Sequence, residues 1–208
     1  EMDTPANRKA ILEQCKNWGI KSLKVDFIEN DNQQTMQWYH DMAREAAEYQ
    51  IMLTFHGSTL PRGQRRRFPN IMTMEGVVGE EFYVQKHWRI KPPAPEHNCI
   101  LPYTRNAVGP MDYNQPLFRR KTTNPRVNSD AHELALVVVY ESGIQHLTDS
   151  PASYQNMNPP VIPFLKAAPA HWDETRFLEG YPGKYICIAR RNGPDWYIGG
   201  ISSEYKRE

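Results

Sequence analysis

The sequence predicts an α/β fold with a parallel sheet, followed by the start of an all-β region. Helix-patterned and strand-patterned segments alternate from residue 4 to residue 55, and a further strand-like run follows at 71–74. This alternation is typical of parallel sheets whose strands are connected by helices. After Gly183 the sequence becomes β-rich around Asn192-Gly193, a dipeptide that favours a two-residue hairpin turn.

Two helices are predicted in the alternating region. The first begins at Thr4-Pro5, because threonine caps helices and proline is tolerated in the first turn, and it ends at Gly19. Its apolar face is expected to consist of Ala10, Ile11, Cys15 and Trp18. The second helix, 32–49, has apolar side chains at helical spacing: Met36, Tyr39, Met42, Ala43 and Ala46.

Three strands are predicted, and each has an acidic residue or a histidine at its carboxyl end. The strand 21–27 contains Asp26, the strand 51–55 is followed by His56-Gly57, and the strand 71–74 is followed by Glu75. In a parallel barrel the carboxyl ends of successive strands face one mouth. We therefore expect these three side chains to lie close together although they are far apart in the sequence.

The connections and later elements are less regular. A polar loop with four arginines is expected at 58–70, and the proline-rich segment 76–97 is expected to cross the mouth of the barrel. Further along the chain, the sequence predicts strands at 100–103 and 143–147, and helices at 131–140 and 160–168.

A domain boundary is predicted between residues 178 and 179. Residues 1–178 are interpreted as part of a barrel, and residues 179–208 as the beginning of a β domain with strands at 184–189 and 196–201. Two strands make a poor sheet by themselves, so we expect the β domain to continue beyond Glu208 in a longer protein.

Composition excludes several classes of partner and site. The 25 basic residues nearly balance the 24 acidic ones, so charge gives no reason to expect nucleic acid or a membrane surface as a partner. The three cysteines form no CxxC pair, which argues against a zinc site or a disulfide framework. The chain does not begin with Met and contains no apolar run of about 18 residues that would span a bilayer.

A series of short motifs runs through most of the chain. In order they are Lys24-Val25-Asp26-Phe27, Phe55-His56-Gly57, Pro61-x-Gly63, Arg67-Phe68-Pro69-Asn70, Glu75-Gly76, Gly79-x-Glu81, Leu101-Pro102-Tyr103-Thr104-Arg105, Gly109-Pro110-Met111-Asp112-Tyr113, His132-x-Leu134-Ala135, Glu141-Ser142-Gly143-Ile144-Gln145 and Trp172-Asp173-Glu174-Thr175. Each motif is weak alone, but together and in this order they resemble the catalytic half of glycoside hydrolase family 97.

The resemblance implies an α-glucosidase or α-galactosidase that hydrolyses oligosaccharides and uses calcium. Members of the family have an N-terminal β-sandwich, a (β/α)8 barrel and a C-terminal β domain. This chain resembles the second half of that TIM barrel, from about the fourth strand, and the start of the C-terminal domain. Members are typically exported, so the resemblance also implies a periplasmic or secreted bacterial protein, whereas the oligomeric state is left open.

The resemblance also assigns catalytic roles. An Asp at the end of the fourth barrel strand and His-Gly after the fifth are the retaining pattern of the family, which implies Asp26 as nucleophile and Glu81 as general acid/base. Retention requires two carboxyl groups about 5–5.5 Å apart, so that one attacks the anomeric carbon directly. The retaining pattern slightly favours a galactoside over a glucoside.

Calcium (Ca2+) and sugar contacts are implied in the same way. Glu75 and Glu81 are the expected calcium ligands, with at least one further ligand from a region outside this chain. Carboxylate oxygens suit calcium, which takes about six to eight oxygen ligands. His56, Arg67 and Asp112 are the expected substrate-binding residues, and Arg67 is expected to pair with a carboxylate of the site.

Several of these residues also have a purely structural interpretation. Asp26 is also suited to cap the next helix or to pair with an arginine, and Asp112 to hold its turn. Glu80 competes with Glu81 for the site, since only one of two neighbours points into it. Trp88 and Tyr113 are candidates both for sugar platforms and for packing. For the chain as a whole, the alternative is an inactive truncated fragment or a sugar-binding relic.

Overall fold

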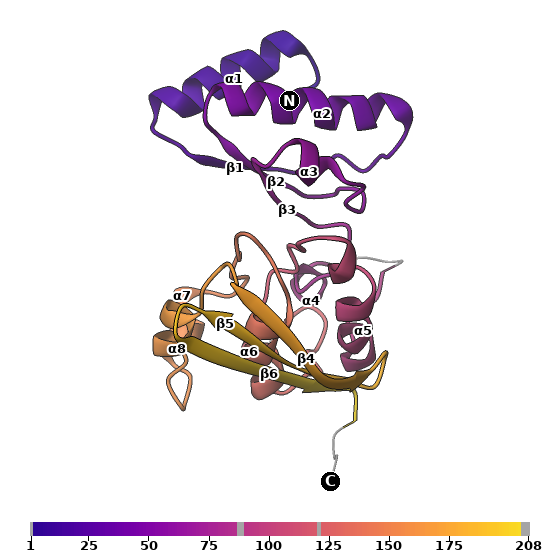
Figure 1. Ribbon diagram of the computed structural model, residues 1–208, viewed down its shortest axis with the longest axis vertical. Helices are drawn as coiled ribbons and strands as arrows, with labels where there is room; N and C mark the ends of the chain where they lie inside the picture. Colours follow the sequence, from indigo (N-terminus) through magenta and orange to yellow (C-terminus); the bar gives the residue numbers. More distant parts are fainter. Residues whose placement is uncertain (1, 87–89, 120–121, 205–208) are drawn as a thin grey trace. The chain divides into compact units, whose positions relative to one another are not determined.

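The computed structural model describes residues 2–86, 90–119 and 122–204 (Figure 1). The chain divides into two compact units, Glu1–Gly76 and Val77–Glu208. Each unit has its own sheet and its own core. Among the described residues, no helix is long and apolar enough to cross a membrane.

The first unit is built from three helix-and-strand pairs. Its elements in order are α1 (Pro5–Asn17), β1 (Ser22–Val25), α2 (Gln33–Glu48), β2 (Met52–Phe55), α3 (Gln64–Arg67) and β3 (Ile71–Met74). Both long helices have the caps that the sequence indicates, because the side chain of Thr4 accepts a hydrogen bond from the Asn7 N–H and that of Asn32 from the Thr35 N–H. The predicted helices and strands of this region are confirmed.

The strands form a parallel sheet in the order β1-β2-β3. Val25 is in register with Phe55, and Phe55 with Met74, so the carboxyl ends of the strands are level. A register shift between Leu53 and Thr54 in the β2–β3 pairing brings the third strand into this alignment. The register therefore places the residues that follow the three strands side by side.

Helices α1 and α2 cover one face of this sheet (Figure 1). The core between them contains Leu12, Cys15, Tyr39, Met42, Ala43, Ala46, Ile51, Leu53, Phe55, Ile71 and Met74. The predicted face of α2 is confirmed, but that of α1 is wrong at two positions, since Ala10 and Trp18 are exposed and Leu12 is buried instead. Trp18 is the residue that follows the last helical residue, so it leaves the helical face.

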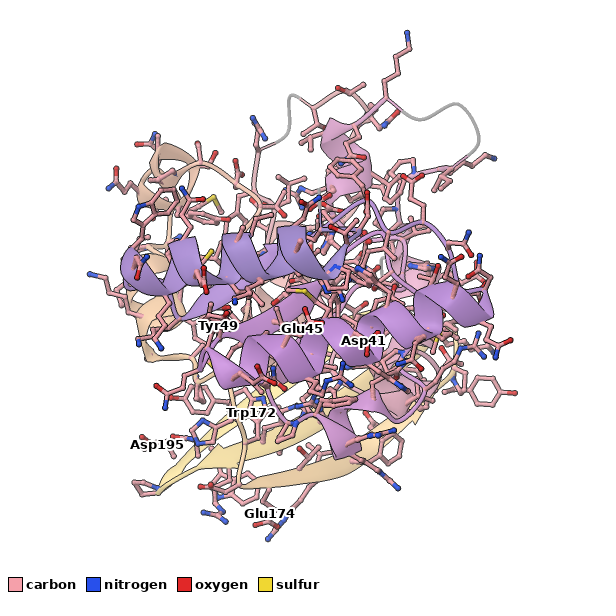
Figure 2. The ribbon with its side chains drawn as sticks, turned by 90° about the horizontal axis from the view of Figure 1, so that it is seen from above. Asp41, Glu45, Tyr49, Trp172, Glu174 and Asp195 are labelled. Atoms are coloured by element: carbon pink, nitrogen blue, oxygen red, sulfur yellow. The ribbon has the colours of Figure 1, made fainter. Side chains whose placement is uncertain are left out.

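Polar side chains join α1 to α2 at their edge. Arg8 forms a two-pronged ion pair with Glu45, at 2.7 and 2.8 Å, and Tyr49 lies near Glu13. Figure 2 shows Asp41 and Glu45 along α2 and Tyr49 directly after its last residue. The Glu45 carboxylate raises the pKa of the buried Arg8 guanidinium, because it favours the charged form.

The second unit combines short helices with an antiparallel sheet. Its elements are α4 (Glu81–Val84), α5 (Pro95–Ile100), the 3-10 turns η1 (Leu101–Tyr103) and η2 (Asn106–Val108), α6 (Asp130–Val139), α7 (Pro151–Gln155), α8 (Ile162–Ala167), β4 (Glu174–Tyr181), β5 (Tyr185–Asn192) and β6 (Asp195–Ser202). The sheet has the order β4-β5-β6. Helix α6 packs against β6, with Val138 and Val139 close to Gly199 (Figure 1).

The sequence predictions in this unit are partly confirmed and partly wrong. The helices near 131–140 and 160–168 and the hairpin strands are confirmed as α6, α8, β5 and β6. The strand predicted at 100–103 is wrong, since this apolar run continues α5 into a 3-10 turn. The strand predicted at 143–147 is also wrong, because the Ser142 hydroxyl and the Gln145 amide bond to nearby backbone carbonyls in a turn-rich segment.

The β sheet also has a strand that the sequence did not indicate. Strand β4 pairs with β5 from Glu174 to Tyr181, with a bulge between Phe177 and Glu179. The predicted domain boundary at 178 and 179 falls inside this strand, and the sheet packs on α6 within the same compact unit.

Candidate active site

The first unit brings Asp26, His56 and Glu75 together at the carboxyl edge of its sheet. His56 Nδ1 lies 3.7 Å from Asp26 Oδ2 and 3.4 Å from Glu75 Oε2. The strand register causes this arrangement: the His56 N–H donates to the Val25 carbonyl and the Glu75 N–H to the Phe55 carbonyl, each at 2.8 Å. The expected convergence of these three residues is therefore found.

Burial differs among the three side chains. His56 is 1% exposed and lies between the two carboxylates, whereas the Asp26 side chain is 35% exposed and that of Glu75 14%. His56 Nδ1 faces both carboxylates, and the Glu75 oxygen is the nearer of the two. Asp26 is the carboxylate of this group that solvent or a ligand reaches most easily.

The backbone beside Asp26 adopts an unusual conformation. Phe27 has a φ of +61°, its side chain is 83% exposed, and its N–H donates to Asp26 Oδ1 at 2.6 Å. Positive φ is costly for a bulky residue and is concentrated at functional sites. Asp26 also lines a surface cleft within the first unit together with Phe27 and Trp38.

Gly57 is the residue that allows this close approach. Its φ is +52°, and a Cβ there would lie 3.1 Å from the Phe27 nitrogen and 3.3 Å from Asp26 Oδ1. Its N–H donates to Glu75 Oε2 at 2.7 Å, and its carbonyl accepts the Glu29 N–H at 2.7 Å. A glycine suits this position because only glycine combines positive φ with the absence of a side chain.

Glu81, the predicted acid/base, is the first residue of α4 in the second unit. Its Oε1 accepts a 2.7 Å hydrogen bond from the Asn114 side-chain amide, and its Oε2 accepts one from Gln85 at 3.1 Å. Glu81 is half-buried, whereas its neighbour Glu80 is fully buried. Within this unit, only Glu81 of the two glutamates reaches the surface.

Glu80 belongs to a buried polar cluster that sequence reasoning did not identify. Burial raises its pKa well above the ordinary value, and nearby Glu133 adds to the effect. Burial also raises the pKa of Glu133, but the Asn128 amide at 2.8 Å and the Arg126 guanidinium at 4.0 Å oppose this effect. The proton of this pair therefore belongs on Glu80. Glu133 is the residue marked x in the motif His132-x-Leu134-Ala135, so this motif was the sequence signal that could have identified it.

Asp112 contacts a histidine that sequence reasoning also missed. The Asp112 side chain is 1% exposed, and its Oδ1 lies 3.0 Å from Nδ1 of the half-exposed His146. A buried carboxylate at this distance fixes the ring and its tautomer. His146 directly follows the motif that ends at Gln145, so the motif marked its neighbourhood without including it.

The other predicted contacts are placed as follows. Arg67 is exposed at the end of α3, and its guanidinium lies 5.3 Å from the centre of the Phe68 ring. Within the described ranges, Arg67 forms no ion pair with a carboxylate. Tyr113 is fully buried and donates to Asn98 Oδ1, so its packing interpretation holds. Trp88 lies outside the described residues.

The donor set suits a hard cation. Glu75 and Glu81 both offer carboxylate oxygens, which are the ligands that calcium prefers. Both side chains are only partly buried, so an ion reaches them without opening a core. The residues that the resemblance implies as calcium ligands thus have the right chemistry.

Two family models match the chain. The model described as Glycoside hydrolase 97 matches residues 2–77, and the model described as Glycosyl-hydrolase 97 C-terminal, oligomerisation, matches residues 171–208. The first match covers the parallel sheet with Asp26, His56 and Glu75. The second covers the whole antiparallel sheet, including β4.

Curated relatives match almost the whole chain. A probable retaining alpha-galactosidase of Streptomyces bingchenggensis is 42% identical over 200 residues, which are 96% of this chain and 30% of that protein. A retaining alpha-galactosidase of Bacteroides thetaiotaomicron is 34% identical over 208 residues, with 93% of this chain and 31% of that protein covered. The chain thus spans about a third of the length of these relatives.

A solved structure agrees with the sequence matches. A crystal structure of a beta-arabinopyranosidase superimposes with a TM-score of 0.87 and 33% identity, over 97% of this chain and 33% of that chain. Family models at both ends of the chain, and relatives along nearly all of it, lead to one assignment. The chain belongs to glycoside hydrolase family 97.

Proposed function

We propose that this chain supplies the catalytic residues of a retaining α-glycosidase that acts on terminal α-galactosides. The observation that carries the proposal is the alignment of Asp26, His56 and Glu75 at the carboxyl edge of a parallel sheet. Active sites of barrel enzymes are built at this edge. Two relatives whose names state a retaining alpha-galactosidase support galactoside over glucoside.

The proposed reaction has two displacements. Asp26 attacks the anomeric carbon while Glu81 gives its proton to the glycosidic oxygen, so the aglycone leaves as an alcohol and a glycosyl ester forms on Asp26. Glu81 then takes a proton from water, whose oxygen attacks the same carbon and releases the Asp26 carboxylate. Two inversions at one carbon give net retention.

The neighbouring residues would support these steps. The Phe27 N–H fixes one oxygen of the Asp26 carboxylate, and His56 Nδ1 lies 3.7 Å from the other, so the nucleophile is oriented before the sugar arrives. We propose Glu75 and Glu81 as residues that would hold Ca2+, whose positive charge would stabilise negative charge in the site. We also propose that β1–β3 are part of a (β/α)8 barrel whose other strands lie outside these 208 residues.

The test uses the extended protein, by which we mean this chain lengthened at both ends to the span of its relatives with its own flanking sequence. The expected result is hydrolysis of nitrophenyl α-galactoside with initial release of α-galactose, detected by NMR. Inverted product would contradict the role of Asp26. Activity in the extended protein but not in the 208-residue chain would identify this chain as an incomplete enzyme.

The role of Asp26 has a sharper test with a matched control. Asp26→Gly should abolish hydrolysis, and added azide should restore turnover with formation of a β-galactosyl azide, because azide fills the space of the missing carboxylate. Asp31→Ala is the control, since Asp31 lies in the same loop but pairs with Arg62 on the surface at 3.3 Å. An active Asp26→Gly variant without azide would refute the assignment.

A further inference from the structure

We propose that Asn114 is a positioning residue for the general acid/base, an inference that rests on the function proposed above. Its side-chain amide donates to Glu81 Oε1 at 2.7 Å across 33 residues of sequence. Asn114 is 4% exposed, so the donor side of this bond is shielded from competing water. A short hydrogen bond to a carboxylate from a buried amide restricts the carboxylate to one orientation.

The backbone around the two residues is joined at the same place. The Glu80 N–H donates to the Tyr113 carbonyl at 2.9 Å, so the residues that precede Glu81 and Asn114 are directly bonded. A Cβ at Gly79 would lie 2.7 Å from that carbonyl oxygen, which shows how closely the two segments approach. Three residues before Asn114, the Met111 N–H donates to the Glu141 carbonyl at 3.0 Å. These hydrogen bonds therefore hold the backbone that carries Asn114 in place.

An asparagine at position 114 has two explanations, a backbone role and a side-chain role, and substitutions can distinguish them. Its φ is +66°, a region in which glycine, asparagine and aspartate are tolerated best. If only the backbone mattered, all three residues would serve. If the amide positions Glu81, glycine would leave the carboxylate unsupported and aspartate would place an acceptor where a donor is needed.

Glu81 needs a fixed orientation because it acts twice on different oxygen atoms. It must first face the glycosidic oxygen and then the incoming water, from one position beside the anomeric carbon. Its contact with Gln85 comes from an exposed side chain one helical turn away and restricts it less. Proton transfer depends strongly on the geometry of donor and acceptor. Of these two contacts, the buried Asn114 amide is the one that we expect to govern proton transfer.

The test compares two leaving groups in the extended protein. Melibiose, with an unactivated sugar as leaving group, needs proton donation, whereas dinitrophenyl α-galactoside does not. Asn114→Asp and Asn114→Gly should lower kcat/KM for melibiose by about 10- to 100-fold but change kcat/KM for the dinitrophenyl substrate by less than about 3-fold. In a Glu81→Gln background, the same substitutions should cause no further loss, because the positioned group is gone.

A matched control variant completes the experiment, and thermal unfolding checks that each variant is folded. Asn156→Asp makes the same chemical change at an exposed position after α7 and should leave both substrates unaffected. Equal losses on both substrates, or no loss on either, would overturn the assignment and leave Asn114 with a backbone role. An unsubstituted extended protein that hydrolyses neither substrate would contradict the proposed function itself, and this inference with it.

Discussion

The N–H of Gly57 donates a 2.7 Å hydrogen bond to Glu75 Oε2 and so joins the end of one strand to the end of the next. The same carboxylate oxygen lies 3.4 Å from His56 Nδ1. Glu75 is therefore held by the backbone and the side chain of two successive residues. This arrangement makes the orientation of a proposed calcium ligand depend on the conformation of a single glycine.

Gly57→Ala should disturb both the fold and the site. Positive φ costs a residue with a Cβ about 1–2 kcal/mol, and here the added carbon would also press on the Phe27 nitrogen and on Asp26 Oδ1. We expect lower stability in thermal unfolding and a loss of kcat/KM of at least about tenfold in the extended protein.

Gly19→Ala is the matched control for this prediction. Its φ is +73°, but a Cβ there would meet no atom within 4 Å. Gly19→Ala should therefore lower the free energy of unfolding only by the cost of positive φ, and it should leave kcat/KM unchanged. Equal catalytic losses in the two variants would show that Gly57 matters only for folding.

The Asp112–His146 pair allows the two interpretations of Asp112 to be separated. If the pair serves the sugar, His146→Ala and Asp112→Asn should each lower kcat/KM by about tenfold, since a hydrogen bond lost at a binding site costs about 1–3 kcal/mol. The double variant should show little additional loss, because both changes break one interaction. If Asp112 only holds its turn, Asp112→Asn should lower the unfolding temperature, while His146→Ala leaves kcat/KM unchanged.

His132 should make the second unit sensitive to acid. Burial lowers the pKa of this histidine to about 4, and the Arg126 charge adds to the effect. The Asn98 amide is oriented by the Tyr113 hydroxyl, which donates to its oxygen, so its nitrogen faces His132 Nε2 at 3.1 Å and requires an unprotonated acceptor there.

The sign of the effect follows from the two pKa values. Between the unfolded value of 6.5 and the folded value of about 4, the unfolded state binds more protons, so stability falls as pH falls. The loss approaches about 1.4 kcal/mol per pH unit. His132→Gln keeps an acceptor for Asn98 but does not titrate, so its unfolding free energy should decrease less between pH 6.5 and 4. Identical pH dependence in both proteins would contradict the buried neutral histidine.

The parts of the fold that could be predicted are those with local signals. Helix α2 combines a cap at Asn32 with an uninterrupted apolar face, and β1–β3 are short apolar runs between helices or polar loops. Strand β4 lacks such a signal, because most of its side chains are exposed and it is bulged; its pairing with β5 defines it. The run 100–103 was misassigned because periodicity alone does not distinguish a short apolar strand from a buried helix end.

The residues of the candidate site show the same difference between local and long-range signals. Asp26, His56 and Glu75 could be placed together because parallel strands present their carboxyl ends at one edge. Asn114 and His146 lie in irregular segments, where contacts between residues more than 30 positions apart decide which side chains meet. No sequence periodicity predicts such contacts.

Gly199 and Gly200 on β6 should respond in opposite ways to the same substitution. A Cβ at Gly199 would lie 2.9 Å from Val138 Cβ and 3.0 Å from Val139 Cγ2, both on helix α6, whereas one at Gly200 would meet only atoms 3.8 Å away. Gly199→Ala must push the helix from the sheet and should cost about 1–3 kcal/mol in chemical denaturation. Gly200→Ala should be neutral or stabilising by up to about 1 kcal/mol, since glycine weakens a strand interior. Equal stability of the two variants would mean that α6 does not pack on β6 as closely as the structure indicates.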